Sequence, residues 1–351
     1  MTRAWNGRAT WLFIPLDVQG AAAYVPAAAN YREQVQRRVY VDPDPTTNDD
    51  RSLMSYFAAV SYNRAIVDAT VSRPVVITNP AAGMNLTSAA INAQPDAHKY
   101  EYLAVVYPVN QVNAGTGMYA PGSFAFAPAR DENRTKARCR FRIDASVGTW
   151  AMEMIHCVTD LTDFYNGVQG PGDFEEMDKS GATHPTAYTK DVLGWLDKTN
   201  GLRTHPRNSS ETYTLHALGL PHPAPSSRVA GIKVDAEGSN RYLIIEARLG
   251  SDRWDRGFSG STGIPSEGVV VYEFAPEEEM WDRNPNDPNG PWAPLELRTQ
   301  TALTVGQSFT HTDSHVTGSG SRDNRSGFGR QRRLTVRAAV PGGFIVDLTS
   351  S

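Results

Sequence analysis

The C-terminal part of the chain constrains the fold most strongly. From residue 206 to residue 351, apolar residues recur only in short runs rich in β-branched and aromatic side chains, and Gly, Pro, Ser and Asn separate the runs. No run has the helical period of about 3.6 residues. Short strands at regular spacing are typical of two packed sheets, so we expect a β-sandwich-like domain over residues 206–351. The runs are TYTLHAL, RVAGIKVDA, RYLIIEARLG, GVVVYEFAP, TALTVGQSFT, RRLTVRAAV and GFIVDLT.

Residues 1–205 mix strand-like and helical segments, which predicts an α+β domain with its boundary near residue 205. The segment RSLMSYFAAVSYN repeats its apolar residues at helical spacing, and one of the residues at positions 48–50 can cap that helix. Residues 31–41 alternate less regularly and give no clear element. The strand-like segments are TWLFIPLDV, AIVDATVSRPVVITN, YEYLAVVYPVN and CRFRIDAS.

Composition excludes several classes of partner. Lys and Arg number 34 against 38 Asp and Glu, so a net charge of −4 gives no global field that favours nucleic acid or a membrane surface. The N-terminus lacks a basic region followed by a sustained apolar run, and no segment has the apolar length of a membrane span. We therefore expect a cytoplasmic protein. Cys139 and Cys157 could pair, but so few cysteines in a long chain are more typical of a reducing compartment, which favours free thiols.

The segment TWAMEMIHCVTDLTDFYN, residues 149–166, is predicted to be one amphipathic helix. Its polar face includes Glu153 and His156, which match the second half of the H-E-x-x-H zinc-protease pattern. In that pattern two histidines bind Zn²⁺ and the glutamate polarises the attacking water. Met152 takes the place of the first histidine and is a large apolar residue within a polar stripe.

The residues after this helix extend the comparison. Met177 is followed by His184-Pro185 and then by Lys190-Asp-Val-Leu-Gly-Trp195. This order resembles the secreted metalloproteases of the immune inhibitor A and gametolysin type, in which a methionine turn and a Lys-x-x-Leu-Gly-Trp segment follow the zinc helix. Residues 52–71, 241–248 and 264–274 are also similar to segments of that family. The resemblance implies a zincin-like domain over residues 1–205, with a mixed sheet, an active-site helix and Met177 in the methionine turn.

The carried-over metal site departs from the family pattern. The first ligand falls on Met152, the base on Glu153, the second ligand on His156 and the third on Thr162, with Asp163 one residue further on. A neutral thioether is a poor ligand for Zn²⁺, and catalytic zinc normally needs three protein ligands. We therefore expect no metal and no other cofactor, a vestigial Glu153 and a pseudoenzyme without catalytic residues.

A zincin holds its substrate as an extended strand against the edge of a sheet, which requires backbone hydrogen bonds and side-chain pockets but no metal. The segment GSFAFAPA, residues 122–129, is the candidate edge. These considerations predict a non-catalytic protein that binds an extended peptide in the former substrate cleft and serves a peptide-modification pathway, such as that of a ribosomal peptide natural product. The predicted peptide-binding residues are Gly122, Ser123, Phe124, Ala125, Phe126 and Met152.

Three alternatives stay open at this stage. The chain could be an active metallohydrolase whose ligands are His156, Asp160 or Asp163, and a distant residue. The C-terminal sandwich could have a structural or carbohydrate-binding role that leaves the helix irrelevant, or Met152 could be a core residue of a helix unrelated to zincins. His311 and His315 have ligand-like spacing, but they lie in a predicted loop or strand, where residues four apart do not share a site.

Overall fold

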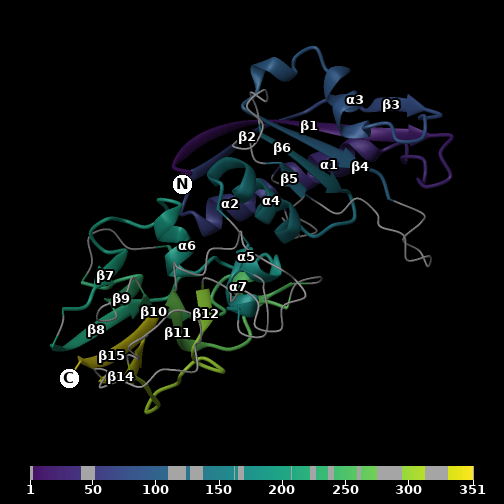
Figure 1. The fold of residues 1–351 in the computed structure, drawn as a ribbon. Helices are drawn as coiled ribbons and strands as arrows, with labels where there is room; N and C mark the ends of the chain where they lie inside the picture. Colours follow the sequence, from purple (N-terminus) through teal and green to yellow (C-terminus); the bar gives the residue numbers. More distant parts are fainter. Residues whose placement is uncertain are drawn as a thin grey trace, which may run out of the picture. The chain divides into compact units, whose positions relative to one another are not determined.

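The computed structural model describes residues 3–40, 52–109, 124–126, 137–161, 163–164, 170–206, 208–221, 227–235, 241–258, 262–274, 295–312 and 331–350. Helices and several sheets occur together, as expected of an α+β protein (Figure 1). Contacts between Cα atoms divide the chain into a first unit, residues 1–161 with 193–195, and a second unit, residues 162–192 with 196–351. The expected boundary near residue 205 therefore lies within the second unit.

The first unit contains one mixed sheet with the strand order β2-β1-β4-β6-β5, and β3 also pairs with β1. All of its strand pairs are parallel except the pair of β5 with β6. The strand-like segments of the sequence are confirmed as strands because their side chains alternate between two buried faces or form continuous apolar runs. The strands are β1 (Gly7–Gln19), β2 (Ala65–Val71), β3 (Val75–Thr78), β4 (Tyr102–Tyr107), β5 (Phe124–Phe126) and β6 (Ala137–Arg142).

Helices cover both faces of this sheet (Figure 1). On one face, α3 packs on the apolar side chains of β1 and β4. On the other face, Trp150 of α4 stacks on Phe13 and Phe141, and α1 and α2 pack beside it. The helices are α1 (Tyr31–Val39), α2 (Leu53–Val60), α3 (Leu86–Asn92), the 3-10 turn η1 (Ala97–Lys99) and α4 (Val147–Thr159).

Two helix predictions change. Residues Tyr31–Val39 form a helix, although the sequence pattern gave no clear element. The pattern is weak because only Tyr31, Val35 and Val39 of this helix are buried. The helix α2 is confirmed, but Ser52 caps it by accepting a hydrogen bond from the Ser55 amide at 3.2 Å. The predicted capping positions 48–50 lie outside the described residues.

The second unit contains two sheets that enclose one apolar core. The five-stranded sheet has the order β12-β11-β10-β9-β7 and the four-stranded sheet has the order β13-β14-β15-β8. Six of the seven predicted C-terminal runs contain a strand, whereas TALTVGQSFT overlaps β13 only in its last three residues; β12 and the parallel pair of β7 with β9 are additions. The strands are β7 (Leu202–Thr204), β8 (Ser210–His216), β9 (Gly231–Asp235), β10 (Tyr242–Arg248), β11 (Gly268–Phe274), β12 (Leu295–Leu297), β13 (Ser308–Thr312), β14 (Gln331–Val340) and β15 (Gly343–Ser350).

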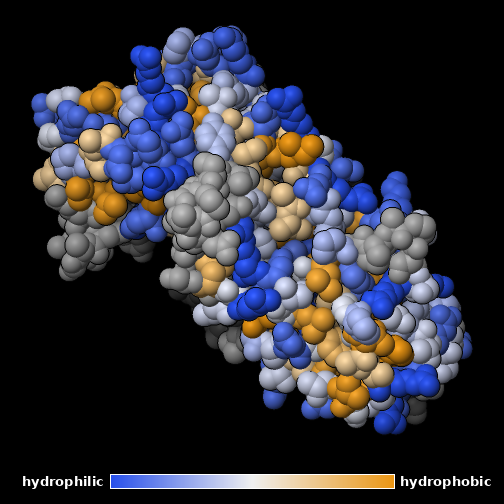
Figure 2. Space-filling model, turned by 180° about the vertical axis from the view of Figure 1, so that it is seen from behind, coloured by the Kyte–Doolittle hydropathy of each residue, from blue (hydrophilic) through white to orange (hydrophobic). Residues whose placement is uncertain are grey.

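Short helices complete the second unit: η4 (Gly172–Phe174), α5 (Glu176–Lys179), α6 (Ala187–Val192) and α7 (Arg253–Arg256). Among the described residues, no helix is long and apolar enough to cross a membrane. Figure 2 shows hydrophilic residues spread over the visible face, with hydrophobic residues in small groups between them. Isolated exposed apolar side chains of this kind are normal on a protein surface.

Candidate functional site

The helix α4 is shorter than its sequence pattern predicts. It begins after Ser146, whose hydroxyl accepts a hydrogen bond from the Thr149 amide at 3.0 Å, and it ends at Thr159. Asp160 then adopts a left-handed conformation with φ of 57°, which Asp tolerates better than most residues. The prediction of one helix through residue 166 is therefore wrong. Asp163 lies after the end of the helix and does not share its polar face, and Thr162 lies outside the described residues.

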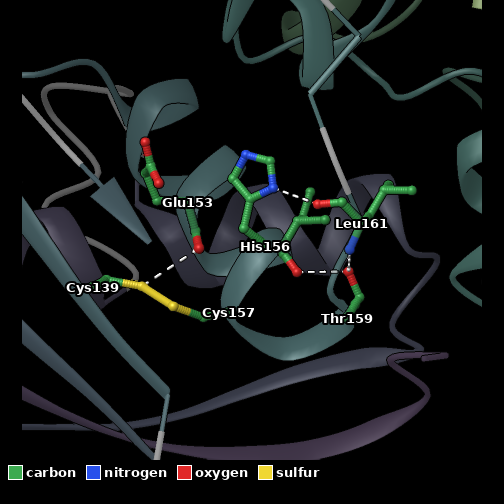
Figure 3. The surroundings of a disulfide bond; sticks show 7 residues. Cys139, Glu153, His156, Cys157, Thr159 and Leu161 are labelled. Carbon is green, nitrogen blue, oxygen red and sulfur yellow. Dashed lines mark hydrogen bonds between the residues drawn. A yellow bond between two sulfur atoms is a disulfide. The ribbon is translucent and has the colours of Figure 1, made fainter. Parts of the chain in front are cut away.

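The three central residues of the pattern differ in exposure. Met152 is 5% exposed, so it is a core residue of α4, and the expected polar stripe does not extend over it. Glu153 and His156 are half-buried. The His156 Nδ1–H group donates a hydrogen bond to the Leu161 carbonyl at 2.5 Å (Figure 3). In neutral His156 this bond places the lone pair on Nε2, as in histidines that accept a proton or bind a metal.

No group of three or more His, Cys, Asp or Glu side chains is arranged to hold a metal ion within the part of the chain that the structure describes. His311 lies in β13, where its ring stacks on Phe309, and His315 is outside the described residues. Met177 is fully buried in α5, and its carbonyl accepts a hydrogen bond from the Phe164 amide at 2.7 Å. Because Met177 and α4 belong to different units, its role in a methionine turn stays a prediction.

The candidate peptide-binding segment includes the last strand in the order of the first unit's sheet. Phe124–Phe126 forms β5 and pairs antiparallel with β6, with Ala125 opposite Cys139. These three residues form a short strand at the end of the described strand order, whereas Gly122 and Ser123 lie outside the described residues, and the peptide-binding role of the segment stays a prediction. The helix α4 packs beside both β5 and β6.

A disulfide links this region of the sheet to α4. Cys139 of β6 and Cys157 of α4 are bonded to each other (Figure 3), which corrects the expectation of free thiols. The Cys139 sulfur also lies 3.4 Å from the Glu153 carbonyl oxygen. Cysteine number and spacing could not show that the two residues face each other, because that proximity depends on how α4 packs on β6. The bond fixes α4 to the strand next to β5.

A buried charged cluster in the second unit was missed by the sequence analysis. At its centre Arg248 is fully buried and donates two hydrogen bonds to the Asp255 carboxylate, at 2.8 and 3.3 Å. It also donates to the Glu246 carboxylate at 3.2 Å. Burial raises the pKa of Glu246 to about 7, and the charge of Arg248 acts in the opposite direction.

Next to this pair, Asp252, His184 and Lys190 form a chain of hydrogen bonds. The His184 Nε2–H group donates to the Asp252 carboxylate at 2.6 Å, and Lys190 Nζ donates to His184 Nδ1 at 2.9 Å. Burial lowers the pKa of Lys190 to about 7, and burial together with the nearby Lys190 lowers the pKa of His184. His184 is therefore held neutral between a donor and an acceptor.

Glu175 completes this network, because its buried carboxylate accepts hydrogen bonds from the Met177 amide, the Thr186 amide and the hydroxyls of Thr186 and Thr189. Donors and acceptors in the cluster face one another, and all of its charged side chains except the half-buried Asp252 are buried, so its physical effect is on stability. His184 and Lys190 of the HPTAYTK segment were visible in the sequence as part of a motif. The partners of this segment, Glu246 of β10 and Asp252 just before α7, are 59 and 68 residues away and could not be assigned without the fold.

Comparison with protein-family models gave no match, and comparison with curated protein sequences gave none either. The relation to the immune inhibitor A and gametolysin type thus stays a resemblance based on the quoted motifs.

Proposed function

We propose that this chain is a non-catalytic peptide-binding protein, a pseudoenzyme on a metalloprotease-like fold that holds a peptide in extended conformation along β5. The observation that carries the proposal is the position of β5 at the end of the sheet order, antiparallel to β6 and beside α4. An edge strand offers backbone N–H and C=O groups to an added strand. Such binding requires no metal ion.

The composition of α4 supports a binding role over a hydrolytic one. At the position of the family's first zinc ligand stands Met152, a buried neutral thioether with low affinity for Zn²⁺. Without a metal ion to lower its pKa, water next to Glu153 ionises no more readily than bulk water, so the hydroxide needed for peptide hydrolysis is scarce. We assign the protein to a pathway of peptide modification, in which a peptide is presented to other enzymes.

Binding can be tested with a panel of fluorescent peptides and anisotropy measurements. Phe124→Asp and Phe126→Asp place a charge on β5 and are expected to weaken binding of a selected peptide by about tenfold or more. Ile66→Asp is the matched control, because Ile66 is 50% exposed on β2, at the opposite end of the sheet order. Melting temperatures of all variants report whether the fold is retained. Unchanged affinity in both β5 variants would refute the proposal.

A second experiment separates this function from that of a metallohydrolase. Metal analysis of protein purified without chelators, together with peptidase assays, is applied to the wild type and to Glu153→Ala. We expect substoichiometric zinc and no activity that depends on Glu153. Stoichiometric zinc with peptidase activity that disappears in Glu153→Ala would establish the enzyme instead.

A further inference from the structure

A cavity of about 390 Å³ opens in the first unit, on the face of the sheet that α3 covers. Its lining residues come from α3 and the residues just before it, from β4 and from β6, together with Tyr24. Its volume falls within the range of about 300–1,000 Å³ that is common for small-molecule sites. The side chains that give it chemical character are Tyr24, Thr87, Tyr107, Arg138 and Arg140.

Two arginines place positive charge in this cavity. Arg138 and Arg140 are two residues apart on β6 and therefore point to the same face of the sheet, about 7 Å from each other along the strand. The residue between them, Cys139, points to the opposite face, where it is bonded to Cys157 of α4. Guanidinium groups favour phosphate and carboxylate groups, which they can bind through two parallel hydrogen bonds.

The other walls of the cavity supply aromatic rings and hydroxyl groups. The rings of Tyr24 and Tyr107 lie 6.3 Å apart, and the Tyr107 hydroxyl is hydrogen-bonded to the Thr87 hydroxyl at 2.8 Å. Burial raises the pKa of both tyrosines, while the charge of Arg140 acts in the opposite direction on each, so this guanidinium lies near both phenols. Both phenols stay protonated at neutral pH, and each hydroxyl can donate or accept a hydrogen bond.

We infer that this cavity binds a small organic anion whose phosphate or carboxylate group lies between Arg138 and Arg140, with its body against the two tyrosine rings. The cavity lies next to β5, because Phe124 is paired with Arg140 and Phe126 with Arg138, but anion binding there does not require that β5 bind a peptide. When the anion binds, guanidinium and hydroxyl donors take the place of the water around its charged group. A cavity of this volume is too small for a folded macromolecule.

Isothermal titration calorimetry with inorganic pyrophosphate and with citrate, at constant ionic strength, tests the inference on the full chain. Saturable binding of one or both anions to the wild type is expected, and the preferred anion shows whether the natural ligand presents a phosphate or a carboxylate. Arg138→Met and Arg140→Met should each raise the Kd by about tenfold or more, because each removes hydrogen bonds between charged groups. Arg140→Lys should give a smaller increase, because it keeps the charge and loses the planar fork.

Arg142→Met is the matched control, since Arg142 lies on the same face of β6 and is not among the residues that line the cavity. Its Kd should stay within about twofold of the wild type. If a Met variant fails to fold, Arg140→Lys takes its place. Thermal melting shows whether this variant is folded, and its Kd then tests the inference. The inference is overturned if the wild type binds neither anion saturably, or if a folded Arg138→Met/Arg140→Met variant retains wild-type affinity.

Discussion

The buried guanidinium of Arg248 gives the sharpest stability prediction. Its side chain is 0% exposed and donates five hydrogen bonds, two to Asp255 and one each to Glu246, the Phe174 carbonyl and the His184 carbonyl. Arg248→Met keeps much of the apolar volume but leaves two buried carboxylates without their closest cation and two carbonyls without a donor. Removing one partner of a buried ion pair costs about 3–5 kcal/mol.

The whole free energy of unfolding of a domain is about 5–15 kcal/mol, so this loss should leave the second unit close to its threshold of stability. Urea unfolding combined with hydrogen exchange of β10 measures the change where Arg248 lies. Arg8→Met is the control, because Arg8 pairs with Asp68 on the surface and exposed pairs contribute little. A loss below about 1 kcal/mol in Arg248→Met would refute the view that this ionic network is essential to the fold.

Three further predictions follow from other contacts. Burial lowers the pKa of Lys190 from 10.5 to about 7. Between these values the unfolded chain binds one more proton than the folded chain, so the free energy of unfolding rises with pH. Urea midpoints measured from about pH 7 to 10 should show this rise in the wild type and not in Lys190→Met. Cys139 and Cys157 should resist a maleimide in denaturant until a reductant is added, and reduction should lower stability by about 3 kcal/mol, since the bond spans 18 residues. Ser52→Ala should cost about 1 kcal/mol, measured by thermal unfolding, because the capping bond to Ser55 is lost.

Much of the strand content could be predicted because it is encoded locally. In β1 the residues Leu12, Ile14, Leu16 and Val18 face α3 while Phe13 faces α4, and the continuous apolar run that indicates a strand buried on both faces is visible in the sequence alone. The C-terminal strands were recognisable for the same reason. In α1, by contrast, only Tyr31, Val35 and Val39 are buried, and a polar helix with three apolar residues has too weak a pattern to identify.

The candidate site shows where local patterns stop. Apolar residues continue at helical spacing past Thr159, yet α4 ends there, and the Thr159 carbonyl accepts a hydrogen bond from the Arg3 amide at 2.7 Å. That partner is more than 150 residues away along the chain. Likewise, β5 was expected at an edge from its composition, but only the pairing of strands placed it next to β6.

The sequence by itself therefore determined the α+β class, most strands, the core of α4 and the residues at Met152, Glu153 and His156 that define the resemblance. Only the tertiary structure decided the disulfide, the end of α4, the ionic network around Arg248 and the cavity at Arg138 and Arg140. The physical reason is that periodicity records which face of an element is buried. It does not record which distant backbone or charged group lies opposite that face.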